Sequence, residues 1–206
     1  MRSRLILAFV ALCCATAPFA QDTSADAAPD RRSSLAFVEY SDYEKGDGIF
    51  AITLGTSVPL GFYDPNQASF RKPQSYPGFA FSLSYLGLLN ENWAIGGDLG
   101  GSFIGTIADR SLFIAPLSFR AGYLINLSPF AIMPSAGLGV AICSLGEYKH
   151  VDPLFKLGSS FYWRQNADMS YGLNIFANVI PQFYKDRSQN MTGFFLEATL
   201  SLAYHL

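Results

Sequence analysis

One pattern recurs along most of the chain: bulky apolar residues alternate with small or polar residues at a period of two. In the first run the bulky residues are Phe50, Ile52 and Leu54, and the residues between them are Ala51 and Thr53. Alternation of this kind predicts a β-strand with one bulky face and one small face. The pattern occurs in eight runs, which begin near residues 48, 78, 93, 113, 130, 155, 171 and 194. The sequence therefore predicts an all-β fold of eight strands.

The links between these runs differ in length. Short links rich in Asn, Ser, Pro and Asp alternate with longer links, and this alternation is typical of antiparallel barrels that cross a membrane. In such barrels the short turns lie in the periplasm and the longer loops lie outside the cell. The short links are Leu88–Asn92, Asn126–Pro129 and Gln165–Asp168, and the longer links lie at about 61–75, 105–111, 143–154 and 182–191.

The distribution of charge indicates which face of the strands points outward. Half of the residues are hydrophobic and only 15% are charged, yet no stretch of the predicted barrel reaches the ~18 apolar residues of a spanning helix. On a water-exposed surface about a quarter to a third of the residues are charged. The small face carries clear charges mainly at Asp98, Arg120, Lys156 and Glu197. We therefore expect the small face to line the lumen and the bulky face to contact lipid. The alternative is a secreted, lipocalin-like barrel with the bulky face inside.

Aromatic residues gather near the strand ends beside the short turns. Rings at these positions are typical of the interface between lipid and water. The predicted periplasmic girdle consists of Trp93, Tyr123, Trp163, Tyr171 and Tyr204.

Two prolines fall within predicted strands. Pro116 and Pro134 cannot donate to the hydrogen-bond ladder. We expect a bulge or a local break at each of them.

The N-terminal region has the features of an export signal. A basic start, Arg2 and Arg4, precedes the short apolar stretch Leu5–Ala15, so residues 1–20 are predicted to be a cleaved signal peptide. Residues 21–47 are predicted to be a polar periplasmic leader, and the barrel takes up 48–206. Removing Arg2 and Arg4 from the 14 Lys and Arg leaves 12 against 16 Asp and Glu, a net charge of −4. This balance argues against nucleic acid as a partner.

The three cysteines predict no disulfide within the mature chain. Cys13 and Cys14 fall in the signal peptide, where lipidation is the alternative to simple cleavage. Only Cys143 remains after cleavage, and one cysteine cannot form an intrachain disulfide.

The signal peptide, the leader, the eight alternating runs and the apolar C-terminal run from Phe194 to Leu206 together resemble the small outer-membrane barrels of the OmpA, OmpX and OmpW type. The resemblance covers residues 48–206. It implies a barrel in the outer membrane of a diderm bacterium with both termini in the periplasm. It also implies that the C-terminal strand, 194–206, is recognised by the barrel-assembly machinery. Such strands often end in Phe, whereas this one ends in Leu206.

The lumen charges leave two functions open. Asp98 and Arg120 lie on neighbouring strands, and buried charges need partners. They form either a salt-bridged plug that closes the bore or a polar constriction in a narrow channel. Apolar residues also point inward, and a partly apolar lumen resembles the OmpW type, which implies passage of small hydrophobic compounds. These residues are Ile114, Met133, Phe176, Ile180 and Phe195.

The longer links suggest a surface function as the alternative to transport. Residues 61–75 and 182–191 combine aromatic with basic side chains, which suits contact with envelope headgroups or a host ligand. An enzyme is not predicted, because His205 ends the last run and His150 lies in a predicted loop with scattered acids. We also expect no cofactor and no metal site.

Overall fold

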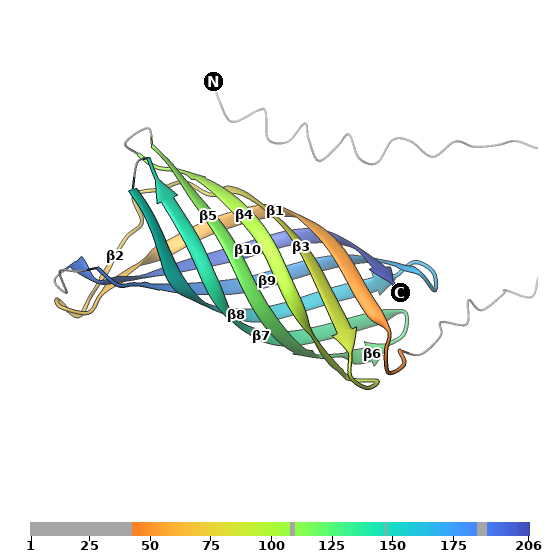
Figure 1. The fold of residues 1–206 in the computed structure, drawn as a ribbon. Coiled ribbons are helices and arrows are strands. Elements are labelled where there is room, and N and C mark those ends of the chain that lie inside the picture. Colours follow the sequence, from red (N-terminus) through yellow and green to blue (C-terminus); the bar gives the residue numbers. More distant parts are fainter. Residues whose placement is uncertain (1–42, 108–109, 147, 185–188) are drawn as a thin grey trace, which may run out of the picture. The chain divides into compact units, whose positions relative to one another are not determined.

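The structure is a computed structural model, and it describes residues 43–107, 110–146, 148–184 and 189–206. The predicted signal peptide and most of the predicted leader lie outside these residues. The described chain consists of β-strands (Figure 1). Their bounds are β1 Gly48–Asp64, β2 Ser69–Arg71, β3 Gly78–Leu88, β4 Trp93–Gly105, β5 Ser111–Tyr123, β6 Ile125–Leu127, β7 Phe130–Leu145, β8 Tyr148–Arg164, β9 Met169–Gln182 and β10 Met191–His205.

The strands close into a barrel. Each long strand pairs antiparallel with its neighbours in chain order, and β10 returns to pair with β1 from Ile49↔His205 to Tyr63↔Thr192. The short strands β2 and β6 extend the links and pair with β1 and β7. Eight strands therefore form the wall, and the predicted fold class is confirmed. Because the wall is closed, it has no strand edge with unpaired backbone groups. Backbone N–H and C=O groups in hydrocarbon must be hydrogen-bonded within the protein.

We call the barrel end that holds Tyr43, Leu206 and the short links the turn end. Here asparagine side chains shape the links: Asn90 Oδ1 accepts the N–H groups of Asn92 and Trp93 at 3.0 and 2.7 Å. Asn166 Oδ1 accepts those of Asp168 and Met169 at 3.0 and 2.8 Å. These side-chain hydrogen bonds stabilise the turns, which explains why Asn is frequent in the short links.

We call the opposite end the loop end. The long link predicted over 143–154 is wrong, because β7 continues to Leu145 and β8 begins at Tyr148, with these two residues paired. Gly146 supports the tight turn with a φ of +63°. The polar residues of this segment belong to strands that continue past the length needed to cross a bilayer: β8 has 17 residues, whereas about 9–11 suffice.

The prolines interrupt the ladder without shifting its register. Opposite Pro116, the β4–β5 pairing skips two positions between Leu99↔Leu117 and Ser102↔Ile114 and resumes in the same register. Pro134 lies where β7 changes partner from β5 to β6. The predicted local breaks are present, whereas bulges are absent at both prolines. The register shift of the β1–β10 pair lies instead between Pro59 and Gly61.

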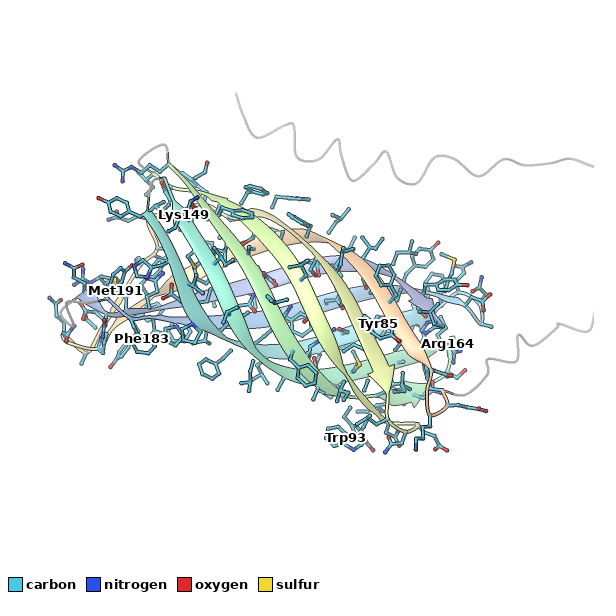
Figure 2. The ribbon with its side chains drawn as sticks, in the orientation of Figure 1. Tyr85, Trp93, Lys149, Arg164, Phe183 and Met191 are labelled. Carbon is cyan, nitrogen blue, oxygen red and sulfur yellow. The ribbon has the colours of Figure 1, made fainter. Side chains whose placement is uncertain are left out.

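The two faces of the wall are inverted relative to a water-soluble protein. Large apolar side chains cover the outside, as Leu138 and Leu200 illustrate with exposed fractions of 65% and 68%. Serine, asparagine and charged side chains are buried in the bore, which rules out the lipocalin-like alternative. Figure 2 shows the side chains around the wall, with Trp93 and Arg164 at the turn end and Lys149, Phe183 and Met191 at the loop end. Of these, Arg164 is buried inside the barrel, with an exposed fraction of 3%. Among the described residues, no helix has the length and apolarity to span a bilayer.

Candidate functional site

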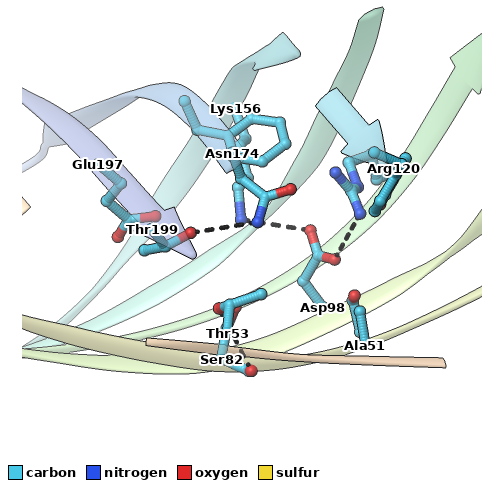
Figure 3. A pocket seen from close by; sticks show the side chains of 12 residues that line it. Ala51, Thr53, Ser82, Asp98, Arg120, Lys156, Asn174, Glu197 and Thr199 are labelled. Carbon is cyan, nitrogen blue, oxygen red and sulfur yellow. Dashed lines mark hydrogen bonds and ion pairs between the residues drawn. The ribbon is translucent and has the colours of Figure 1, made fainter. Parts of the chain in front are cut away.

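Three charged side chains from different strands meet in the middle of the bore (Figure 3). The Asp98 carboxylate on β4 forms two ion pairs. Its Oδ1 lies 3.2 Å from Arg120 Nη2 on β5, and its Oδ2 lies 3.3 Å from Lys156 Nζ on β8. Ser118 Oγ donates to the same carboxylate at 3.4 Å. All three charged side chains are at most 6% exposed. Asp98 therefore compensates two buried cations at once, which burial in a low-dielectric bore requires.

An aromatic ring completes the cluster. Phe176 lies with its ring centroid 4.9 Å from the Arg120 guanidinium carbon and 4.6 Å from Lys156 Nζ. The electron-rich face of a ring attracts cations most strongly where water is excluded. Phe176, predicted only as an apolar lumen residue, thus stabilises the same two cations as Asp98.

Glu197, the fourth predicted lumen charge, lines the same cavity but stands apart from the three. Among the described residues it makes no ion pair within 4 Å, whereas its neighbour Thr199 accepts a hydrogen bond from Asn174 Nδ2 at 3.4 Å. Glu197 also borders the next cavity toward the loop end, together with Asn178 and Phe195. The structure thus brings three of the four predicted charges together and leaves Glu197 beside them.

The free space around these charges is small. The cavity lined by Asp98, Arg120, Lys156 and Glu197 has a volume of about 10 Å³, and so has the next cavity toward the loop end. A cavity of this volume holds about one water molecule. The middle of the bore is therefore filled by side chains.

An apolar cluster closes the turn end. Tyr43, which precedes β1, inserts into it and is 4% exposed. The Arg164 guanidinium carbon lies 4.6 Å from the Tyr43 ring centroid, and the His205 ring meets Tyr43 edge-on at 5.4 Å. Burial raises the pKa of Tyr43 to about 12, although Arg164 opposes the shift. Sequence reasoning missed Tyr43, because a single ring among polar residues carries no periodic signal. The other members of the turn-end cluster are Ile49, Ala51, Leu86, Leu88, Ala94, Leu124, Ala131, Met133, Tyr162 and Ala203.

A second apolar cluster closes the bore toward the loop end. Phe195 lies within it and packs edge-on against Phe62 with 6.0 Å between ring centroids. The other buried members of the loop-end cluster are Ile104, Ile114, Ala141, Cys143, Leu154 and Ile180. The bore thus contains an apolar cluster toward each end and the ion cluster of Asp98, Arg120 and Lys156 between them.

Outside the loop-end cluster lies an open groove of about 530 Å³ between the β1–β2 link and the β9–β10 link. The carboxylate of Asp64 is buried there and pairs with Arg71 Nη2 at 2.7 Å. Arg71 and Tyr184 lie in the ranges 61–75 and 182–191, for which the sequence suggests a surface function. The lining consists of Asp64, Asn66, Gln67, Arg71, Tyr184, Gln189 and Met191.

The five predicted girdle aromatics lie at the turn end and point outward. Trp93 pairs with Tyr123 across β4 and β5, with 5.3 Å between ring centroids. Trp163 pairs with Tyr171 across β8 and β9 at 6.2 Å, and Tyr204 lies opposite Met169. Their position at an interface with lipid headgroups remains a prediction.

The two histidines lie in different surroundings. His150, predicted to lie in a loop, is on β8, where its ring packs on Tyr184 at 4.6 Å and its Nδ1 lies 3.8 Å from Asp152. His205 Nε2 lies 2.6 Å from Ser170 Oγ at the turn end, and Ser170 is completely buried. Among the described residues, no three His, Cys, Asp or Glu side chains gather closely enough to bind a metal ion.

A closed antiparallel barrel with an apolar outer wall and an ionic bore defines a small outer-membrane β-barrel. Solved structures share this architecture. The crystal structure of Neisserial surface protein A matches with a TM-score of 0.57 at 10% identity, over 78% of this chain and 97% of that chain. The crystal structure of the outer membrane protein OprG from Pseudomonas aeruginosa matches with a TM-score of 0.50 at 11% identity, over 82% of this chain and 99% of that chain. At such identities the likeness concerns the fold alone.

A protein-family model matches residues 27–204, so the chain belongs to a family whose shared region contains nearly the whole barrel. No curated protein matches the chain significantly by sequence. The predicted resemblance to small eight-stranded outer-membrane barrels is confirmed at the level of the fold.

Proposed function

We propose that the protein is a closed outer-membrane barrel that acts at the cell surface through its loop end, without a conducting lumen and without catalysis. The observation that carries this proposal is the filled bore. Apolar side chains close both ends, the ion cluster fills the middle, and the cavities between them hold about one water molecule each.

The energetics of the ion cluster support a closed bore. A channel through the middle would need Asp98 to separate from Arg120 or Lys156, with which it is in contact. Removing one partner of a buried ion pair costs about 3–5 kcal/mol, because the other charge is left uncompensated. Passage of small apolar solutes would in addition require Tyr43 and Phe195 to move.

The surroundings of the nucleophilic side chains support a non-enzymatic role. Ser170 is hydrogen-bonded to His205, but it is completely buried, so a substrate cannot reach its hydroxyl group. Cys143 lies opposite His150 on the neighbouring strand, yet its side chain is buried in the loop-end cluster. Nucleophilic catalysis needs an activated group that a substrate can reach.

The length of the strands supports an external position for the loop end. β1 and β8 have 17 residues each, several more than a bilayer requires, and both strands extend to the loop end. We propose that this end is extracellular and that Tyr43 and Leu206 are periplasmic. A membrane-impermeant maleimide on intact cells tests this topology in a Cys143→Ala background. Gln67→Cys should be labelled and Glu91→Cys should not; the reverse would contradict it.

The C-terminal strand, 194–206, is proposed to be the segment that the barrel-assembly machinery recognises. In the finished barrel β10 is paired on both sides, with β9 and β1. An edge that a partner could pair with is therefore available only before closure. Crosslinking from position 200 to the assembly machinery during pulse labelling, lost at later times, is the expected result.

Conductance tests the closed bore. The protein is refolded in detergent, its folding is checked by heat-modifiable gel migration and β-rich circular dichroism, and it is inserted into planar bilayers. We expect no steady conductance and no swelling of liposomes in sugar solution. A reproducible wild-type conductance that changes in Arg120→Ala would contradict the proposal and restore the narrow-channel alternative.

A further inference from the structure

Residues 43–47, directly ahead of β1, are fixed to the turn end of the barrel. Gly46 N–H donates to the carbonyl oxygen of Leu88 on β3 at 3.0 Å, and Leu88 N–H donates to the carbonyl oxygen of Asp47 at 2.8 Å. Glu44 N–H donates to Asp47 Oδ2 at 2.8 Å, which stabilises the turn between these two residues. The segment therefore continues the pairing of β1 with β3 and carries Tyr43 into the turn-end cluster.

Tyr43 is held inside the turn end by contacts of its ring. The Arg164 guanidinium carbon lies 4.6 Å from the ring centroid of Tyr43, and the His205 ring lies 5.4 Å from it with 63° between the ring planes. The Tyr43 hydroxyl group is buried and has no hydrogen-bond partner among the described residues. A buried hydroxyl group without a partner is unfavourable. Packing therefore keeps Tyr43 in place, and a hydrogen bond of its hydroxyl group does not contribute.

The surroundings of His205 suit a neutral imidazole. Nε2 lies 2.6 Å from Ser170 Oγ, whereas Nδ1 is buried without a hydrogen-bond partner among the described residues. A neutral imidazole has one N–H group, and a protonated imidazole has two. In the protonated ring the Nδ1–H group would carry part of a positive charge without an acceptor among these residues. Protonation of His205 therefore conflicts with the observed packing.

Charged groups from three parts of the turn end act on His205. They are Arg164 at the end of β8, Asp168 in the link between β8 and β9, and Asp47 ahead of β1. Carboxylates favour a protonated imidazole, whereas a guanidinium group and burial disfavour it. Because Arg164 and His205 contact the same ring, a protonated His205 would place two cations around Tyr43. The phenol of Tyr43 is neutral in acid and cannot compensate them.

We propose that Tyr43, Arg164, Ser170 and His205 form an acid-sensitive latch, which releases residues 43–47 from the turn end when His205 is protonated. The closed latch contains the neutral ring, so its stability is complete above about pH 6.5, the ordinary pKa of histidine, and falls as the pH falls. Release leaves the ion cluster and the loop-end cluster in place, so the bore stays closed. What changes is the length of free chain ahead of β1.

Hydrogen exchange of the wild-type barrel in detergent micelles tests the latch. Amide protection is measured by NMR at pH 7.5 and 4.5 and corrected for the intrinsic exchange rates. The reporters are the amides of Gly46 and Leu88, which bond residues 43–47 to β3. Their protection factors should fall at least about tenfold at pH 4.5, because opening is coupled to proton uptake by His205. The amides of Leu138 and Leu200, in the middle of strands paired on both sides, should keep their protection.

The two histidines provide a matched pair of variants. His205→Gln keeps a hydrogen-bonding group beside Ser170 but cannot be protonated, so Gly46 and Leu88 should stay protected at both pH values. His150→Gln removes the histidine of β8 at the loop end, whose side chain is 37% exposed, and should respond to acid as the wild type does. Heat-modifiable gel migration shows that each variant is folded.

The chemical shift of the His205 ring gives a second measurement that needs no variant. In the wild type its titration midpoint should coincide with the midpoint of the loss of protection at Gly46 and Leu88. Midpoints that do not coincide, or protection that is unchanged in acid, would overturn the latch. An equal loss of protection in His205→Gln would also overturn it and would assign the change to carboxylates such as Asp47 and Asp168. Loss of protection at Leu138 together with Gly46 would show unfolding of the whole barrel and no latch.

Discussion

The two ends of the bore are sealed by different means. At the loop end the seal is made by the barrel wall itself, from strand residues such as Phe195 and Phe62. The place of Phe195 follows from the alternation, whereas Phe62 faces inward because the β1–β10 register shifts between Pro59 and Gly61. At the turn end the seal depends on Tyr43, which comes from the chain ahead of β1 and is held between Arg164 and His205. The comparison teaches that one end is closed by the fold and the other by a segment that the fold captures.

The ion cluster between the two seals has the largest expected effect. Asp98→Ala should lower the free energy of unfolding by about 4 kcal/mol, because it leaves Arg120 and Lys156 buried without their carboxylate. Urea titration in lipid vesicles, followed by gel migration, measures it. Ser118→Ala is the matched control, since it removes only a 3.4 Å hydrogen bond to the same carboxylate and should cost about 1 kcal/mol. Equal losses in both variants would refute the central role of Asp98.

The loop-end seal should come next. Phe195→Ala creates a cavity in the loop-end cluster and should cost about 3 kcal/mol in the same titration, because Phe195 is 4% exposed and packs on Phe62. Phe195→Leu keeps most of the volume and should cost less than about 1.5 kcal/mol. If Phe195→Ala left the free energy of unfolding unchanged, Phe195 would not be tightly packed and the loop end would not be sealed.

The turn-end seal should show itself in alkaline solution. The pKa of Tyr43 is raised to about 12 by burial, above the ordinary value near 10. The stability that this shift contributes is fully present below pH 10 and is lost as the pH rises through 12. Tyr43→Phe removes the ionisable group, so the variant should lose less stability than the wild type between pH 9.5 and 11.5. Parallel losses in the two proteins would show that Tyr43 is not held in the seal.

The smallest effect concerns where the turn end sits in the bilayer. The chain has two tryptophans, Trp93 and Trp163, and both belong to the predicted girdle. Lipids brominated near the headgroup should quench their fluorescence more than lipids brominated near the bilayer centre. Trp93→Phe and Trp163→Phe separate the two signals and should give the same depth order. Stronger quenching by lipids brominated near the bilayer centre would contradict the predicted position of both rings at the interface.

The strands and their faces could be predicted because a period of two is a local property. The positions of Phe50, Leu138 and Leu200 on the lipid side follow from neighbours one and two residues away. The same argument placed Asp98, Arg120 and Lys156 inside the bore, and it identified the links that form the groove. It failed at 143–154, where polar residues indicated a loop although they lie on strands that are longer than a bilayer crossing requires.

The sequence by itself determined which side chains enter the bore and which meet lipid, because alternation assigns each residue to a face. Only the tertiary structure decided which of them meet. Asp98 and Lys156 are 58 residues apart, and they meet across the bore because closure of the barrel brings β4 and β8 around one lumen. Tyr43 enters the turn end and Arg71 comes to lie near Tyr184 for the same reason: closure joins β1 to β10, a contact that no local pattern encodes.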